Sequence, residues 1–174
     1  MAQLPPTLQR ALLAGDHSIR ARKIAILVAH GVEGQSVAGV HAALLAMGAH
    51  PCYVAPRIGP VKTADGVFID AEASLENEPG FLFDAMVLPD GVTGVQALDR
   101  DSHTRAFIRD QHGCGKAILA MPASLALLDA AGVSTTLPSG QPDPGVVIGH
   151  DITAFIRAVV RLRHPERHAA PPTH

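Results

Sequence analysis

The sequence predicts a doubly wound α/β domain with a mainly parallel sheet and helices on both faces. Three observations lead to this fold class. Short runs such as KIAILVA at 23–29 are apolar throughout, which is typical of strands buried on both faces of a parallel sheet. The segments between these runs repeat apolar residues at helical spacing. Glycine and proline separate the two kinds of segment, so strands and helices are expected to alternate along the chain.

The first half of the chain is expected to hold two core strands, one helix and a hairpin. The helix is expected over 35–47, because its apolar residues share one face and Gly48 follows as a helix end. Asp65-Gly66 stands between two short extended pieces, a pattern that predicts a small hairpin. The core strands are expected at 23–29 and 51–55.

The second half is expected to supply two further core strands, a short strand and three helices. Asp101 or Ser102 is expected to cap a helix that runs to Gln111. The final helix begins near Asp151, carries an apolar stripe at helical spacing and stops before Pro165. The other expected elements are strands at 83–88, 116–121 and 145–149 and a helix at 124–131.

Composition favours one globular domain and argues against several classes of partner. We expect an N-terminal arm at 1–22, a domain at 23–164 and a flexible tail at 165–174. The net charge is −2 and the basic residues are scattered, so no nucleic-acid partner is expected. No apolar run approaches the roughly 20 residues of a membrane span. Two cysteines do not make a disulfide framework, and a cytoplasmic location is therefore expected.

A functional site is expected in the loops that follow the strands, because ligands of such sheets bind at the strands' carboxyl ends. His30 and Glu33 follow the first strand and could meet Asp90 after the third, as an acid/base group or as a polar rim. Gly91 and Ser124 are further candidates for lining a cleft there. The ten histidines lack the spacing of metal ligands, so no metal site is expected.

The turn after the strand at 116–121 stands where many α/β enzymes carry a nucleophile. Met121 occupies the position, and a thioether has no proton to lose. Pro122 follows and removes a backbone N–H that could have faced an oxyanion. Neither residue can therefore supply nucleophilic chemistry.

Four stretches of the chain resemble the DJ-1/PfpI superfamily, and within it the C-terminal domain of large-subunit catalases. They are DHSIRARKIAILVAHGV, APRIGPVKTADGVFIDAEASL, FDAMVLPDG and AFIRAVVRLRHPER. The resemblance implies a flavodoxin-like, class I glutamine-amidotransferase-like fold. It also implies where active members of the superfamily would place three groups: the cysteine at Met121, the glutamate at Ser36 and the histidine around Leu137. All three roles are vacant here.

The resemblance implies a non-catalytic domain with a structural, assembly or chaperone-like role in oxidative-stress defence. A haem core would be its partner, in cis or in trans, and a homo-oligomer is expected. Tyr53 is the only tyrosine and lies in a core strand, so no haem or other cofactor is expected in this chain. The alternatives are a hydrolase or glyoxalase with a rebuilt site, and a small-molecule binding module.

Overall fold

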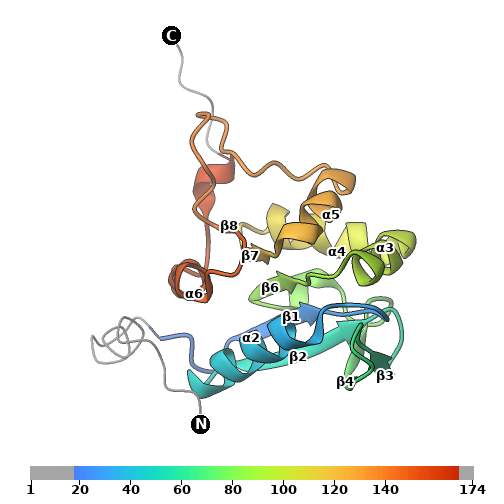
Figure 1. Cartoon of the computed structure of the whole chain (residues 1–174). Helices are drawn as coiled ribbons and strands as arrows, with labels where there is room; N and C mark the ends of the chain where they lie inside the picture. The colour runs from blue at the N-terminus through green and yellow to red at the C-terminus, as the bar shows by residue number, and fades with distance from the viewer. Residues whose placement is uncertain (1–17, 169–174) are drawn as a thin grey trace.

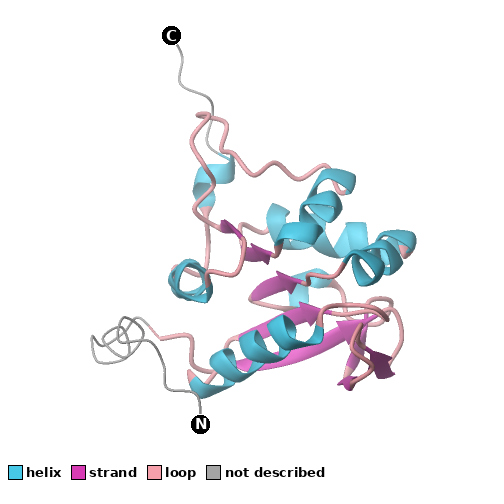
Figure 2. Ribbon diagram, viewed as in Figure 1, coloured by secondary structure: helices cyan, strands magenta, loops and turns pink. Residues whose placement is uncertain are grey.

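The computed structural model describes residues 18–168, which form a three-layer α/β structure around a six-stranded sheet (Figures 1 and 2). The sheet has the order β5-β2-β1-β6-β7-β8, and every neighbouring pair is parallel. The predicted fold class is confirmed. The strands are β1 (Lys23–Leu27), β2 (His50–Ala55), β5 (Ala73–Ser74), β6 (Ala85–Leu88), β7 (Ala117–Ala120) and β8 (Val146–Ile148).

Helices cover both faces of the sheet. On one face lie α2 (Gly34–Ala46) and α6 (Ile152–Val160), and on the other lie α3 (Val92–Arg100), α4 (Ser102–Gly113) and α5 (Leu125–Ala130). Residues 18–168 also contain three short 3-10 helices: Gly80–Leu82, Pro122–Ser124 and Pro165–His168. Within residues 18–168, no helix combines the length and the apolar character needed to cross a bilayer.

Strand β1 shows why the core runs are apolar throughout. Ile24 and Ile26 point into the cluster beneath α2 and α6, whereas Ala25 and Leu27 point into the cluster beneath α3, α4 and α5. All four side chains are buried. Because successive side chains of β1 point to opposite faces of the sheet and helices cover both faces, apolar residues are needed at every position.

A second, two-stranded sheet lies beyond the carboxyl end of β2. It consists of β3 (Gly59–Lys62) and β4 (Phe68–Ala71), which pair antiparallel. The turn between them contains Gly66, whose φ of +87° suits glycine. The hairpin predicted around Asp65-Gly66 is therefore confirmed.

Strand β5 and helix α3 were not predicted from the sequence. Strand β5 is only two residues long, too short for a pattern to form. Helix α3 occupies a segment to which the sequence pattern assigned no element. Gly94 interrupts its apolar stripe of Val95 and Leu98. A Cβ at Gly94 would stand 2.4 Å from Cγ1 of Val32, so this glycine allows α3 to approach the loop after β1.

The folded unit extends beyond the expected boundaries at both ends. Ile19 is buried in the core, although it lies in the expected arm. Pro165–His168 form a 3-10 helix in which Arg167 is buried and paired with Asp143, so the first four residues of the expected tail are not loose. Residues 1–17 and 169–174 of the arm and tail lie outside the described part of the chain.

Candidate functional site

The turn after β7 carries Met121, the position of the vacant nucleophile. Its side chain is fully buried, and its N–H donates to the carbonyl of Leu88 at 3.2 Å. Its backbone is extended, with φ −67° and ψ 157°, rather than strained as in a nucleophile elbow. A side chain at Met121 is therefore packed into the core and does not face a substrate.

Ser124 does not line a cleft, contrary to the prediction. It is fully buried, and its hydroxyl donates to the carbonyl of Pro89. Its amide donates to the carbonyl of Met121 at 2.8 Å. The hydroxyl therefore satisfies a buried carbonyl between neighbouring strand ends, which is a structural role.

Glu33 is the N-cap of α2. Its carboxylate accepts hydrogen bonds from the amides of Gln35 at 3.0 Å and Ser36 at 2.9 Å, and the Ser36 hydroxyl donates to the Glu33 carbonyl at 3.2 Å. Hydrogen bonding by Ser36, from its side chain first and then its amide, holds the pKa of Glu33 below its usual range. The Glu33 carboxylate thus provides an acceptor for two free amides at the start of α2, and the Ser36 hydroxyl is bonded to the Glu33 carbonyl.

Replacing Glu33 by alanine is expected to lower the free energy of unfolding by about 1 kcal/mol at neutral pH, since two helix amides lose their acceptor. The folded pKa of Glu33 lies below that of the unfolded chain, about 4.3. The stabilisation is therefore complete above that value and is lost as the pH falls through the folded pKa. Urea unfolding of both proteins between pH 3 and 7 should show curves that converge at the acid end.

Asp90 joins several strand ends at the carboxyl edge of the sheet. Its Oδ1 accepts from the amide of Ala123 at 3.0 Å, and its Oδ2 lies 3.4 Å from Nε2 of His150. Its carbonyl accepts from the amide of Glu33 at 3.0 Å. His150 was missed in the sequence, although its place directly after the strand at 145–149 could have identified it.

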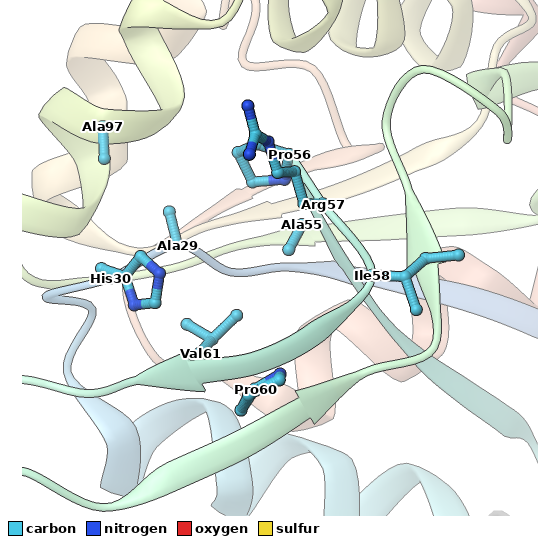
Figure 3. Close-up of a pocket in the computed structure, with 9 residues that line it drawn as sticks. All are labelled: Ala29, His30, Ala55, Pro56, Arg57, Ile58, Pro60, Val61 and Ala97. Carbon is cyan, nitrogen blue, oxygen red and sulfur yellow. The ribbon is translucent and has the colours of Figure 1, made fainter.

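His30 lies apart from this network. Its Nδ1 accepts from the amide of Lys62 at 3.0 Å, and its ring lines a hollow between β1, β2 and the β3–β4 hairpin (Figure 3). Neither Glu33 nor Asp90 lines that hollow. The structure therefore does not bring the three predicted acid/base residues together as one group.

Gly91 packs tightly instead of lining open space. Its φ is +96°, and a Cβ there would stand 2.6 Å from the amide nitrogen of Glu33. The loops after β1 and β6 are thus in backbone contact at this point, which leaves no open space between these two loops.

Leu137 is not part of the carboxyl edge. It lines a small hollow with His112 and Arg167, beside the residues that lead into β7. The position that the resemblance suggested for a histidine is therefore remote from Met121 and Ser36. Across the described residues, no three His, Cys, Asp or Glu side chains are grouped so that they could hold a metal ion.

Comparisons with known proteins agree with this architecture. The model of the DJ-1/PfpI family matches residues 22–139. Catalase HPII of Pseudomonas putida is 33% identical over 168 residues, which is 95% of this chain and 22% of the catalase. Catalase HPII of Pseudomonas aeruginosa is 32% identical over 170 residues, 95% of this chain and 23% of that protein. The matched part of these catalases is their C-terminal region, so the chain spans less than a quarter of their length.

Solved structures show the same fold. A THiJ/PfpI family protein from Pseudomonas syringae superposes with a TM-score of 0.68 and 21% identity, covering 100% of this chain and 84% of that one. DJ-1beta of Drosophila melanogaster superposes with a TM-score of 0.66 and 21% identity, covering 84% of this chain and 93% of that one. The match of the family model over most of the chain, together with this shared fold, shows that the chain belongs to the DJ-1/PfpI family.

Proposed function

We propose that the protein is a non-catalytic domain of the type found at the C-terminus of large-subunit catalases, acting in assembly with a haem core. The observation that carries the proposal is the burial of Met121 at the end of β7. A nucleophile must be accessible and must have a base beside it. Met121 meets neither condition, and the neighbouring hydroxyl of Ser124 is bonded to a backbone carbonyl.

The polar groups around Met121 support the same conclusion. Glu33 and Ser36 cap a helix, and Asp90 holds the amide of Ala123. A catalytic acid or base must be free to exchange a proton with a substrate. Both carboxylate oxygens of Glu33 and Oδ1 of Asp90 are instead bonded to backbone amides, and Oδ2 of Asp90 faces His150. We therefore favour a structural role over a rebuilt hydrolase or glyoxalase site.

The catalase relationship supports a catalase haem core as the partner in this proposal. Nearly all of this chain matches less than a quarter of a catalase, so the haem core is the natural partner, in cis or in trans. The β3–β4 hairpin offers a contact surface, because Val67 and Phe68 are 59% and 63% exposed. Large apolar side chains exposed at adjacent positions of one hairpin fit an interaction site. A cytoplasmic homo-oligomer that takes part in oxidative-stress defence is part of the same proposal.

Docking can be tested with a catalase core that lacks its own C-terminal region. Light scattering after mixing should detect a complex, and Phe68→Ser should weaken it about tenfold or more. Leu45→Ser is the matched control, because Leu45 is 57% exposed on α2, away from the hairpin. The docking proposal fails if no complex forms, or if both variants weaken it equally. Suppression of client aggregation by the pure protein would favour a chaperone-like role instead.

Restoring a cysteine should not restore hydrolysis. In Met121→Cys the thiol would be buried, and desolvation would raise its pKa away from the reactive thiolate. We expect no esterase, peptidase or glyoxalase turnover above the parent, and slower alkylation than at the partly exposed Cys114. The double variant Met121→Cys, Ser36→Glu also restores the superfamily's glutamate position. Clear turnover by either variant would show that the site is not dismantled.

A further inference from the structure

The hollow that contains His30 is a feature that an assembly role does not require. It has a volume of about 460 Å³, within the range of small-molecule sites. It lies where the chain leaves β1 and β2, which is the edge at which open α/β sheets bind ligands. Figure 3 shows its walls: the loop after β2 and the β3–β4 hairpin on one side, and Ala97 of α3 on the other.

The floor of the hollow is apolar and rigid. Ala29, Ala55 and Val61 line it and are buried core residues, so small aliphatic side chains close it from below. Pro56, in the loop after β2, and Pro60, in β3, flank them and restrict the backbone there. A preformed apolar floor of this kind suits a hydrocarbon chain or ring.

His30 presents a hydrogen-bond donor to this space. Its Nδ1 accepts the amide proton of Lys62, so the neutral ring must carry its own proton on Nε2. Figure 3 shows the imidazole turned from the loop after β1 toward the space above Val61. The backbone bond thus fixes the tautomer, and a ligand meets an N–H donor whether His30 is neutral or charged.

Arg57 supplies a positive charge at the rim. Figure 3 shows its guanidinium beside Pro56, and within residues 18–168 no carboxylate lies at ion-pair distance from it. None of the nine lining residues is acidic. The hollow therefore offers one cation and one N–H donor and is lined by no side-chain carboxylate.

We infer that this hollow binds a small amphipathic carboxylate, with its apolar part on Ala29, Ala55 and Val61 and its carboxylate between Arg57 and His30. Guanidinium and carboxylate match in geometry through paired N–H···O bonds. A single cation balances a singly charged acid, whereas a phosphate group would retain uncompensated charge. Binding requires no catalysis, so this inference does not depend on the role of Met121.

The test is an NMR titration of the 15N-labelled full chain with hexanoate, benzoate and hexanol to millimolar concentrations. We expect saturable shifts at His30, Arg57 and Val61 with the two acids, and at least tenfold weaker binding of hexanol, which lacks the charge. Arg57→Gln should weaken hexanoate about tenfold, the cost of one charge-assisted hydrogen-bond pair. Ala97→Leu should reduce binding by filling the hollow from a half-buried helix position.

Arg157→Gln is the matched control, since Arg157 is exposed on α6 and does not line the hollow. It should leave the affinity for hexanoate unchanged. The inference is overturned if none of the probes gives saturable shifts at the hollow. It is equally overturned if hexanol binds as tightly as hexanoate, or if Arg57→Gln and Arg157→Gln weaken binding alike. None of these outcomes bears on docking to a catalase core, which Phe68→Ser tests separately.

Discussion

Replacing Arg167 by methionine should lower the free energy of unfolding by about 3–5 kcal/mol, the usual cost of removing one partner of a buried ion pair. The side chains of Arg167 and Asp143 are 2% and 0% exposed, and Nε of Arg167 donates to Oδ2 of Asp143 at 2.5 Å. Without the guanidinium, Asp143 would remain as a buried charge whose Oδ1 still accepts from the amide of Gly145 at 2.8 Å.

The position of Arg167 adds to this cost. Its Nη1 donates to the carbonyl of Lys116 at 2.7 Å and to that of His112 at 3.2 Å. These carbonyls lie at the end of α4 and just before β7, while Asp143 lies just before β8. One side chain therefore joins the end of the chain to three separate segments, and its loss leaves several buried acceptors without a donor.

Equilibrium urea unfolding measures this effect, with Arg163→Met as the matched control. Arg163 is exposed, and among the described residues its side chain donates only to the carbonyl of Cys114, so its loss should cost about 0.5 kcal/mol. The double variant Arg167→Met, Asp143→Leu should recover part of the stability, because no lone charge remains. A loss below about 1 kcal/mol for Arg167→Met would mean that the pair does not hold the end of the chain.

The sheet could be predicted from the sequence because its pattern is local. Strands buried on both faces are continuous apolar runs, as β1 shows, and the helices between them carry visible stripes. Helix α3 escaped prediction because Gly94, required for contact with Val32, removes an apolar position from a nine-residue helix. The ion pair between Arg167 and Asp143 was not predicted for a different reason. The two residues are 24 positions apart, and such pairs leave no periodic signal in the sequence.

The candidate site was predicted in part. The fold class predicted its location at the carboxyl ends of the strands. The thioether of Met121 predicted that this position cannot act as a nucleophile. The predicted meeting of His30, Glu33 and Asp90 is not seen in the structure. Each side chain instead accepts a backbone N–H from a different segment: Lys62, the start of α2, and Ala123. Which backbone donor a polar side chain finds depends on loop geometry, and the order of residues alone does not determine it.

Replacing Gly91 by alanine should cost about 2–6 kcal/mol of unfolding free energy. The φ of +96° is strained for any residue with a Cβ, which costs about 1–3 kcal/mol. The added Cβ would also stand 2.6 Å from the amide nitrogen of Glu33 and 2.9 Å from the carbonyl oxygen of Gly31, and such overpacking costs a further 1–3 kcal/mol or so. Gly39→Ala is the matched control: it has open space in α2 and should gain about 0.5–1 kcal/mol.

The size of the Gly91→Ala effect also bears on function. The hydrogen bond from the amide of Glu33 to the carbonyl of Asp90 lies at the same contact, so its hydrogen-exchange protection should fall in Gly91→Ala and persist in Gly39→Ala. A large loss means that the loops after β1 and β6 are packed against each other and leave no room for a substrate beside Met121. If Gly91→Ala costs less than about 1 kcal/mol, the loops after β1 and β6 can move apart at little cost. A substrate could then enter beside Met121, and the packing of these loops would no longer support the non-catalytic proposal.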